Sequence, residues 1–460
     1  MSPRRRVAAA LVALLPLLAG AVTSTVPAAA EVAPAYSASV LQQDRWVPPK
    51  PPQNYDPPAG VTFNYPLGTL DAQQAIRRHI NRTIDSPPAG ARIEILSWNI
   101  RDDLFVDKLI AAHKRLVTVR VLIAHGNWSK DNPNELMDRL RQALLTEGRP
   151  WSNDLRPRAE RSRAKGRNRS CRGTRGIAHA KHYLFSHVGP SLDDPIATDV
   201  VMHGSANATI VATNQQWNDI HTLKNRPNVH RYFSDRFKES ETDAPVLPPY
   251  SRADFPGFTI EFLPWGARQG DPTLMQLNAI RCSGATGGTG VNGMTHIRIG
   301  QTAFLDDRGL AIAERLKTMW DRGCNIRIVY ALMGNKVLAA VRDPSGRGPM
   351  PIQQITQDWQ NDGVYDRYLH TKFMAISGVY AGETSAEVSI NGSTNWTAKA
   401  MRSDETIGTV HDPAIRRQYA AWVDQRFVSP PPGAAPQGRM AVPSGDVDIP
   451  GPDRYHGIEP

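Results

Sequence analysis

The sequence predicts an α/β protein of two similar lobes, each a mixed, mostly parallel β-sheet covered by helices, with the lobes related by a pseudo-twofold axis. Three observations support this prediction. Strand-type and helix-type apolar patterns alternate in each half of the 460-residue chain, an order that typically builds βαβ units. The second half repeats the element order and two short motifs of the first. Each half is also long enough to bury its own core.

The N-terminus has the pattern of a secretory signal peptide. Arg4, Arg5 and Arg6 precede an apolar run over residues 7–22, and three alanines at 28–30 offer a cleavage site of small residues. We expect residues 1–30 to be removed and the protein to be secreted. No later segment carries enough consecutive apolar residues to predict a membrane span.

The first half gives the clearest secondary-structure pattern. Residues 31–60 are rich in proline and predict an extended lead-in. Residues 70–84 place isoleucines four residues apart on one helical face, and residues 92–98 alternate as a strand does. A helix over 105–116 and a strand over 117–124 complete a β-α-β unit, which favours parallel pairing.

The second half repeats this order. We predict helices over residues 274–280 and 308–320 and strands over 296–299 and 325–332. The expected organisation is a first lobe at 61–240, a proline-rich surface linker at 241–256, a second lobe at 257–428 and a proline- and glycine-rich tail at 429–460.

Charge and cysteine content narrow the function classes. The formal net charge is +10, and loss of the three signal-peptide arginines leaves 51 Lys and Arg against 44 Asp and Glu, or +7. A basic secreted protein is biased toward polyanions or anionic surfaces, although the excess also serves solubility alone. Three cysteines allow one disulfide, and we favour Cys282–Cys324, which leaves Cys171 unpaired. Their spacing gives no zinc signature.

Two motifs occur twice and carry the chemistry. A His-x-Lys stands at the start of an apolar run, and a Gly-Ser-x-Asn follows about twenty residues later. On a strand, alternate side chains share a face, so these groups can converge. Imidazole can attack phosphorus or carry a proton, lysine neutralises a phosphoryl oxygen, and hydroxyl and amide groups donate hydrogen bonds. The residues concerned are His179, Lys181, Ser205 and Asn207 in the first copy, and His370, Lys372, Ser393 and Asn395 in the second.

These paired motifs resemble the phospholipase D superfamily, and the resemblance covers residues 61–428. The family signature continues from the Lys over four positions to an Asp, where this sequence has Ser186 and Ser377. Strand alternation turns both serines away from the motif, so we expect them to affect strand packing or outer hydrogen bonds more than the chemistry.

The resemblance implies a two-step displacement through a phosphohistidine, without a metal or other cofactor. We expect His179 to be the nucleophile and His370 the general acid and base, with both Lys and both Asn binding the equatorial oxygens and both Ser supporting them. The family also has an acidic residue that holds the ring of the His in the same motif. Glu405 is in position for the second copy, and Asp219 is the nearest candidate for the first, with an ordinary turn carboxylate as the alternative.

A basic run immediately precedes the first motif, and we expect a mobile loop at the mouth of the site that contacts the substrate, with Arg172 and Arg175 nearest His179. Such a loop grips either lipid headgroups or a nucleic-acid backbone. We expect a monomeric phospholipase D-type enzyme that hydrolyses glycerophospholipids at a membrane or micelle surface to phosphatidic acid and free headgroup. A secreted metal-independent nuclease and an inactive phosphate-binding module are the alternatives.

Overall fold

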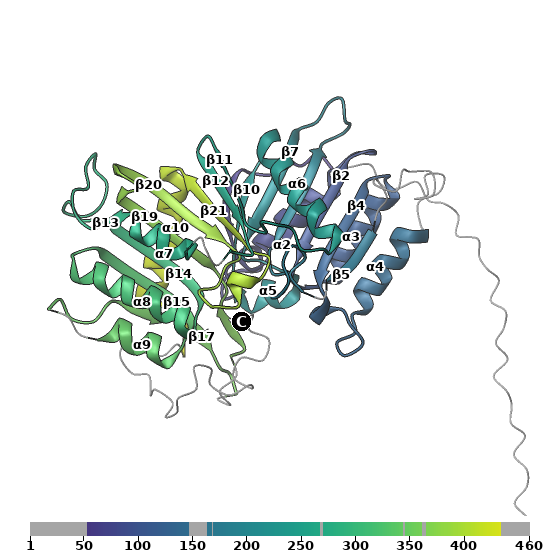
Figure 1. The fold of residues 1–460 in the computed structure, drawn as a ribbon. Coiled ribbons are helices and arrows are strands. Elements are labelled where there is room, and N and C mark those ends of the chain that lie inside the picture. Colours follow the sequence, from purple (N-terminus) through teal and green to yellow (C-terminus); the bar gives the residue numbers. More distant parts are fainter. Residues whose placement is uncertain are drawn as a thin grey trace, which may run out of the picture. The chain divides into compact units, whose positions relative to one another are not determined.

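The computed structural model describes residues 53–146, 163–167, 169–266, 270–343, 346–360 and 365–433 (Figure 1). The predicted signal peptide, most of the proline-rich lead-in and the tail beyond residue 433 lie outside the described residues. The same is true of residues 147–162, which include the first part of the basic run.

Among the described residues, the first lobe has a seven-stranded sheet in the order β1-β10-β7-β6-β2-β4-β5. Only β2, β4 and β5 run parallel to one another, and the other neighbours are antiparallel. The strands are β1 (Gly60–Phe63), β2 (Arg92–Ser97), β4 (Thr118–Ala124), β5 (Arg163–Arg167), β6 (His182–Val188), β7 (Ala197–Gly204) and β10 (Asp219–Leu223).

The second sheet repeats this order in β12-β21-β20-β19-β14-β15-β16, with β11 added at one edge and β13 paired to β19. Again three neighbouring strands, β14, β15 and β16, are parallel. The strands are β11 (Ser251–Phe255), β12 (Phe258–Phe262), β13 (Ile280–Arg281), β14 (His296–Phe304), β15 (Asn325–Met333), β16 (Ile352–Gln354), β19 (Lys372–Tyr380), β20 (Glu383–Gly392) and β21 (Thr406–His411).

The expected α/β class and repeated lobes are thus confirmed, but the expectation of mostly parallel strands is wrong. The parallel part of each sheet is the predicted β-α-β unit together with one further strand. Of the antiparallel neighbours, β19 and β20 are joined by a turn of only two residues, 381–382. A connection of that length can join only antiparallel neighbours.

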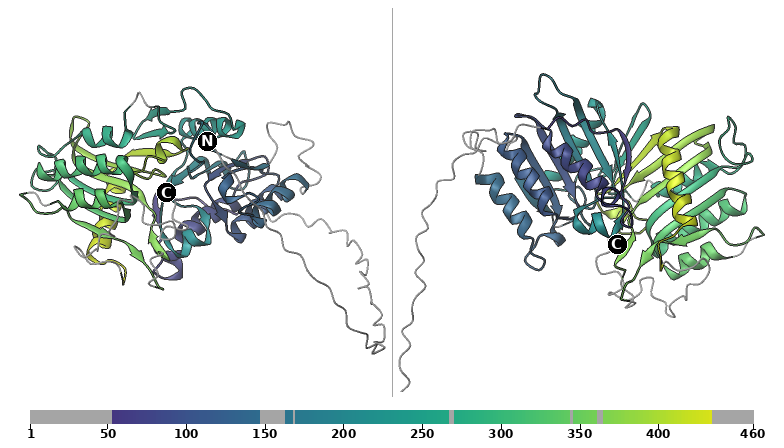
Figure 2. Two further views of the ribbon diagram at one scale, coloured as in Figure 1. Left: turned by 60° about the horizontal axis from the view of Figure 1, so that its bottom comes forward. Right: turned by 180° about the vertical axis from the view of Figure 1, so that it is seen from behind.

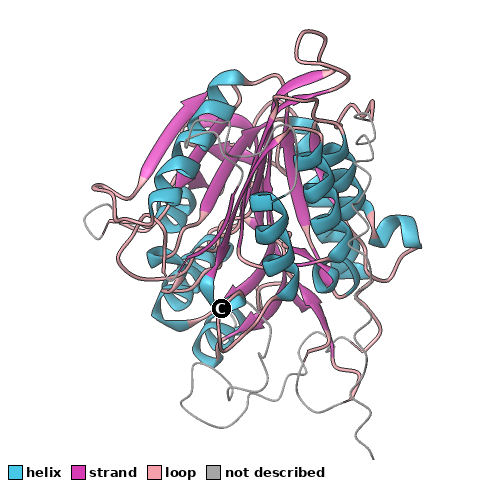
Figure 3. Ribbon diagram, turned by 90° about the vertical axis from the view of Figure 1, so that its right-hand side faces the viewer, coloured by secondary structure: helices cyan, strands magenta, loops and turns pink. Residues whose placement is uncertain are grey.

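Helices cover both faces of each sheet, as the end view shows (Figure 3). In the first lobe α2, α3 and α4 cover one face and α6 covers the other; in the second, α7, α8 and α9 cover one face and α10 the other, visible in yellow from behind (Figure 2, right). The helices are α1 (Leu70–Gln73), α2 (Ala75–Asp85), α3 (Asp103–Lys114), α4 (Glu135–Thr146), α5 (Ile210–Asn214), α6 (Pro227–Thr242), α7 (Pro272–Asn278), α8 (Asp306–Asp321), α9 (Asn335–Arg342) and α10 (Pro413–Val428). No helix in the described ranges combines the length and apolar character that a bilayer span needs.

One hydrophobic core joins the lobes. Phe233 and Phe237 of α6 belong to the same buried cluster as Phe258 of β12 and Tyr419 and Val423 of α10. Each lobe also has a separate core on its outer helical face. The joint core holds the two motif-bearing sheets against each other, because burial of apolar side chains from both lobes stabilises their contact.

A row of three buried histidines crosses the first sheet inside this joint core. His182 on β6 lies opposite His203 on β7, which lies opposite His221 on β10. Aromatic rings surround the row: Phe233 contacts His182 and His203, and Phe258 contacts His203 and His221. Burial lowers the pKa of His182 to about 3 and that of His221 to about 4.

One local feature differs from the sequence prediction, and another agrees with it. The segment expected to be a surface linker contains β11, which pairs with β12 at the edge of the second sheet. The disulfide between Cys282 and Cys324 is present as expected, and Cys171 is a free, buried thiol whose pKa burial raises.

Candidate active site

The two motifs occupy equivalent places at the junction of the lobes. His179 and His370 each stand just before a central strand, β6 or β19, and each Gly-Ser-x-Asn begins where β7 or β20 ends. The His-x-Lys segments therefore lie at the entry of their strands, with Lys372 the first residue of β19. This edge of each sheet is also the carboxyl end of its parallel strands, where sites in α/β proteins commonly form.

Backbone pairing ties each motif to the opposite lobe. Ala178 forms a parallel bridge with Asp404, and the His179 N–H donates to the Asp404 carbonyl at 3.1 Å. In the same way β18 (Arg367–Leu369) pairs in parallel with β9 (Gln216–Trp217), and the His370 N–H donates to the Trp217 carbonyl at 2.9 Å. The contacts repeat with the lobes exchanged, as a twofold relation requires.

Each imidazole is held by a side chain from the other lobe. His179 Nδ1 lies 2.7 Å from Glu405 Oε1, and the second oxygen of Glu405 accepts from Ser393. His370 Nδ1 lies 2.7 Å from Asn218 Oδ1, and Ser205 Oγ lies 3.1 Å from the same oxygen while sharing its one hydrogen with the neighbouring Asp219 carboxylate. Each Ser therefore supports the group that holds the imidazole of the other copy.

This arrangement corrects two expectations. Glu405 holds His179 and not the His370 of its own motif, because the parallel bridges carry each motif across to the opposite lobe. Asp219 does not hold His179; the residue before it, Asn218, occupies the place equivalent to Glu405. Asn218 follows Ser205 by thirteen residues and Glu405 follows Ser393 by twelve, so a search for acidic residues at a fixed interval misses it.

Asn218 has a fixed orientation. Its amide nitrogen donates to the Ala212 carbonyl at 3.0 Å, and its backbone N–H donates to Asn64 Oδ1 at 2.7 Å. The amide oxygen is thereby directed at His370, whose Nδ1 must carry the hydrogen because a carbonyl oxygen can only accept.

Asp219 points into the joint core. It accepts from Tyr419 Oη at 2.8 Å, from Ser205 Oγ at 2.8 Å and from Asn391 Nδ2 at 3.4 Å. Burial raises the pKa of its carboxyl, whereas these hydrogen bonds act in the opposite direction. Asp219 therefore joins the lobes rather than orienting a motif imidazole.

The glycine of each Gly-Ser-x-Asn allows a close approach to the next strand. A Cβ at Gly204 would lie 2.5 Å from the Asp219 carbonyl oxygen, and one at Gly392 would lie 2.0 Å from that of Thr406. A larger residue would push the strands apart. The glycines thus bring each Ser within hydrogen-bond reach of the group that it supports.

Both motif lysines are buried and directed at the histidines. Lys181 Nζ donates to the His179 carbonyl at 2.7 Å. Lys372 Nζ donates to the His370 carbonyl at 2.9 Å and lies 2.8 Å from His370 Nε2. His179 and His370 themselves are 1% and 0% exposed. In so buried a setting the lysine charges would act on a bound anion more strongly than they would in water.

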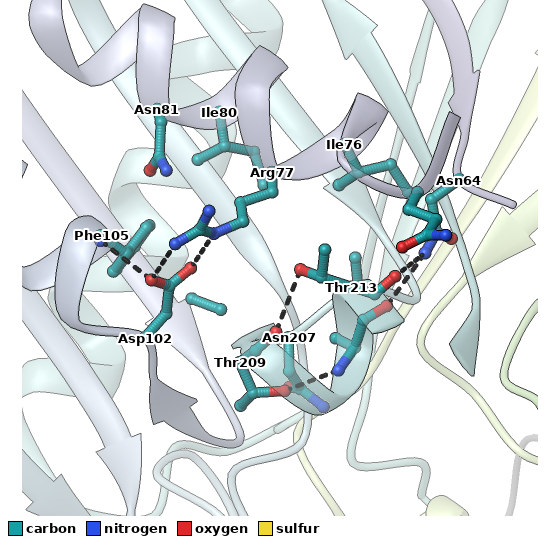
Figure 4. A pocket seen from close by; sticks show the side chains of 14 residues that line it. Asn64, Ile76, Arg77, Ile80, Asn81, Asp102, Phe105, Asn207, Thr209 and Thr213 are labelled. Carbon is teal, nitrogen blue, oxygen red and sulfur yellow. Dashed lines mark hydrogen bonds and ion pairs between the residues drawn. The ribbon is translucent and has the colours of Figure 1, made fainter. Parts of the chain in front are cut away.

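The two motif asparagines lie beside these groups at the junction of strand and loop. Asn207 Oδ1 accepts from Ser97 at 3.4 Å, and the Asn395 carbonyl accepts from Arg308 at 2.7 Å. Asn207 also lines a pocket between α2, α3 and α5 (Figure 4), in which Arg77 makes a two-pronged ion pair with Asp102 at 2.5 and 2.7 Å. That ion pair fastens α2 to the start of α3.

The arginines expected to bind substrate lie differently. Arg172 is 2% exposed; its guanidinium pairs with Glu239 at 2.8 Å and donates to the Leu263 carbonyl, so it fastens the loop to α6 and the second lobe. Arg175 is exposed four residues before His179. The described part of the basic run is not an open loop either, because Arg163 lies in β5 and pairs with Glu241.

The two serines in place of the signature Asp lie in the sheets. Ser186 Oγ accepts from the Arg92 backbone N–H at 2.8 Å, and Ser377 Oγ accepts from Gly290 N–H and donates to Glu387. Both satisfy strand and loop groups. Among the described residues, no group of three His, Cys, Asp or Glu side chains is placed to hold a metal ion.

Comparison with known proteins gives one family match. The family model described as cardiolipin synthase, PLD-like domain, matches residues 292–427, which contain the second motif pair. No curated protein sequence gives a significant match. Repeated α/β lobes with paired His-x-Lys motifs define a phosphodiesterase- or synthase-type fold. Residues 292–427 therefore form a PLD-like domain, the domain of the phospholipase D superfamily.

One solved structure supports a similar fold at low sequence identity, and two others match with lower TM-scores. Phosphatidylserine synthase from Haemophilus influenzae is 12% identical, with a TM-score of 0.50 over 84% of this chain and 88% of the synthase. Polyphosphate kinase from Porphyromonas gingivalis is 12% identical, with a TM-score of 0.49 over 80% of this chain and 50% of the kinase, so the chain spans half of that protein. Nuc from Salmonella typhimurium, a phospholipase D family member, is 17% identical over 40% of this chain and 96% of Nuc, with a TM-score of 0.29.

Proposed function

We propose that the protein is a secreted phosphodiesterase that hydrolyses glycerophospholipids to phosphatidic acid and free headgroup. The observation that supports this most directly is the pair of buried His-x-Lys motifs, in which His179 and His370 are each oriented by the opposite lobe at 2.7 Å. Two oriented imidazoles are what a two-step displacement at phosphorus needs, since one forms the covalent bond while the other moves the proton.

The reaction proceeds through a phosphohistidine. In the first step one Nε2 attacks phosphorus, the bond to the headgroup oxygen breaks, and the other imidazole protonates that oxygen. In the second step the same imidazole takes a proton from water, which attacks phosphorus and releases the first histidine. The Nδ1 hydrogen bonds to Glu405 and Asn218 keep both rings in the tautomer whose Nε2 faces the substrate.

The lysines and asparagines supply electrostatic stabilisation. Lys181 and Lys372 add two positive charges beside the imidazoles, and Asn207 and Asn395 add amide donors. These groups bind the equatorial phosphoryl oxygens, where negative charge accumulates in the transition state.

The lipid assignment draws on two points. Both motif copies lie in one chain, so a monomer holds a complete site. The matched family model is that of cardiolipin synthase PLD-like domains, and its chemistry concerns phospholipids. A phosphoryl group bound to histidine can pass to an alcohol in place of water, so transfer between headgroups is a second outcome of the same site.

Both imidazoles are buried, so a phosphodiester reaches them only if the chain around them opens. A soluble short-chain phosphatidylcholine therefore tests access to the site separately from vesicle binding. The assay measures choline release from that substrate and from phosphatidylcholine vesicles, and nicking of plasmid DNA, all with EDTA present. We expect choline release from both lipids and no nicking.

Three variants complete the experiment. His179→Ala and His370→Ala should each abolish choline release, whereas His187→Ala, on β6 beyond the motif, should retain it. Nicking of DNA without choline release would identify a nuclease instead. Silence on all three substrates, with vesicle or DNA binding retained, would identify an inactive phosphate-binding module.

A further inference from the structure

The helical turn that follows each Gly-Ser-x-Asn motif is exposed, and the two copies carry different side chains. In the first copy, Val211 of α5 is exposed four residues after Asn207. In the second copy, Lys399 is exposed four residues after Asn395, and the exposed Arg402 lies in the same turn. An apolar side chain in one lobe thus corresponds to a cation in the other.

The cationic turn packs against the loop that leads to His179. A Cβ at Gly176 would lie 2.3 Å from the Arg402 carbonyl oxygen, so the two backbones are in close contact. This contact brings the exposed Arg175 next to the turn that carries Lys399 and Arg402. We call Arg175, Lys399 and Arg402 the cationic rim.

In the part of the chain that the structure describes, no side chain of the cationic rim forms an ion pair with a carboxylate. The neighbouring Asp404 is 3% exposed and accepts instead from Ser170 Oγ at 2.8 Å and from the Arg172 N–H at 3.2 Å. Partial burial lowers the pKa of Lys399. A partly buried cation without a carboxylate partner favours an anion from outside the chain.

The corresponding surface beside α5 is apolar. Ile210 and Val211 are 43% and 44% exposed, and Trp359 is 52% exposed. Arg367 connects them, because its guanidinium donates to the last carbonyl of α5 at 3.4 Å and lies 4.9 Å from the Trp359 ring centroid. Asp366 offsets the charge of this arginine. We call Ile210, Val211 and Trp359 the apolar rim.

The two rims lie on opposite sides of the motif imidazoles. The loop that carries Arg175 leads to His179, and β18, which begins at Arg367, leads to His370. Because a pseudo-twofold axis relates the lobes, these segments lie on opposite sides of the axis and at the same level along it. A phosphodiester between the imidazoles would therefore have one substituent directed toward each rim.

We propose that the cationic rim binds an anionic group on the lipid headgroup, and that the apolar rim contacts the glycerol and acyl part of the same lipid. Resting on the proposed function, this assignment makes the preferred substrate a glycerophospholipid whose headgroup carries a phosphate or carboxylate of its own. Three cations favour such a headgroup over an uncharged one, and apolar side chains favour contact with acyl carbon. Phosphatidylcholine is then a slower substrate.

Two soluble dioctanoyl lipids, phosphatidylinositol and phosphatidylinositol 4-phosphate, differ only in one headgroup phosphate. Release of dioctanoyl phosphatidic acid is measured by mass spectrometry with EDTA present. We expect kcat/KM to be about tenfold higher for the phosphorylated lipid, or about 1.4 kcal/mol, which is within reach of three exposed ion pairs. In the Lys399→Gln/Arg402→Gln double variant this ratio should fall below about twofold.

The matched control is Arg281→Gln/Arg322→Gln. It removes two exposed cations at the edge of the second sheet where β14 and β15 begin, opposite the edge that carries the motif, and should keep the ratio. Equal kcat/KM for the two lipids in the wild type, or an unchanged ratio in Lys399→Gln/Arg402→Gln, would overturn the headgroup assignment. So would loss of sedimentation with phosphatidylserine-containing vesicles in that variant without a change in the ratio, because the rim would then bind the bilayer surface.

Trp359→Ala tests the apolar rim. We expect kcat/KM to fall by about fivefold for dioctanoyl phosphatidylinositol 4-phosphate and by less than about twofold for glycerophosphoinositol 4-phosphate, which has no acyl chains. Equal losses would contradict the acyl contact. Circular dichroism of each variant checks that it folds.

If the wild type releases phosphatidic acid from no lipid, the proposed function fails, and calorimetric titration with the two inositol lipids tests the cationic rim by itself. Tighter binding of the phosphorylated lipid that is lost in Lys399→Gln/Arg402→Gln would support the rim, and equal binding of both lipids would overturn it.

Discussion

The row of His182, His203 and His221 should make the protein sensitive to acid. All three rings are buried among aromatic side chains, and neither ring nitrogen of His182 has a hydrogen-bond partner in the described structure. Burial lowers the pKa of His182 to about 3, against 6.5 for an exposed imidazole. The unfolded chain then binds a proton at a pH where the folded chain does not, so acid favours unfolding.

The size of the effect follows from linkage. Above pH 6.5 His182 is neutral in both states and contributes no pH dependence. As the pH falls from 6.5 toward 3, the free energy of unfolding decreases, and at pH 5 His182 alone should account for a loss of about 2 kcal/mol relative to pH 7.5. His221, whose pKa is about 4, should contribute a similar amount at pH 5.

The substitution His182→Leu removes the titrating group and keeps an apolar side chain of similar size against Phe233 and Phe262. Urea unfolding at pH 7.5 and pH 5 gives the loss of stability for each protein. The wild type should lose about 2 kcal/mol more than the variant over this interval. Other titrating groups are common to both proteins and cancel in this difference.

His125→Leu, at an exposed position after β4, controls for the general effect of replacing a histidine. An equal loss in the wild type and His182→Leu would refute the reasoning, because it would mean that His182 accepts its proton equally well in the folded and unfolded chain.

Three further changes have defined outcomes. Arg172→Ala should lower the melting temperature and leave KM for short-chain phosphatidylcholine unchanged, because the Arg172 guanidinium is buried and paired with Glu239. A raised KM with an unchanged melting temperature would show instead that Arg172 binds substrate. Cys282→Ser should reduce the free energy of unfolding by about 4 kcal/mol, since the disulfide with Cys324 closes a loop over a separation of 42 residues, and urea unfolding with and without reductant measures this. Gly392→Ala should lower kcat and stability together, because its Cβ would lie 2.0 Å from the carbonyl oxygen of the next strand, and a variant with wild-type values would show that the strands can separate without cost.

Much of the fold was predictable because its signals are local. Apolar periodicity located α3, α8 and the strands β2, β4 and β15 to within a few residues, and the repeated motifs revealed the duplication. The parallel strands β5 and β16 were not predicted, and β14 extends five residues beyond its predicted end at residue 299. The antiparallel majority was not predictable from the β-α-β units alone, since it depends on which strands lie side by side. The helix expected over residues 70–84 is divided at Gln74, where α1 ends and α2 begins.

The residue types of the site were predictable from the sequence, but their hydrogen-bond partners were not. The His-x-Lys and Gly-Ser-x-Asn residues are recognisable from their spacing, whereas the groups that hold the rings come from the opposite lobe. Asn218 could not be found by a search for acidic residues, and Glu405 was assigned to the wrong ring, because interval counting within one half is blind to a contact between halves. Likewise Arg172 is a residue type that commonly binds phosphate, but its positive charge is paired with the Glu239 carboxylate.

The exchange of ring-holding groups between lobes makes neither half self-sufficient. A fragment ending after α6 would keep His179 and lose Glu405, and a fragment beginning at β11 would keep His370 and lose Asn218. After mixing, two such fragments would restore both ring contacts only if they associate through the joint hydrophobic core. A displacement of one lobe relative to the other would weaken the hydrogen bonds to both imidazoles at once. Each lobe thus needs the other lobe to orient its own imidazole.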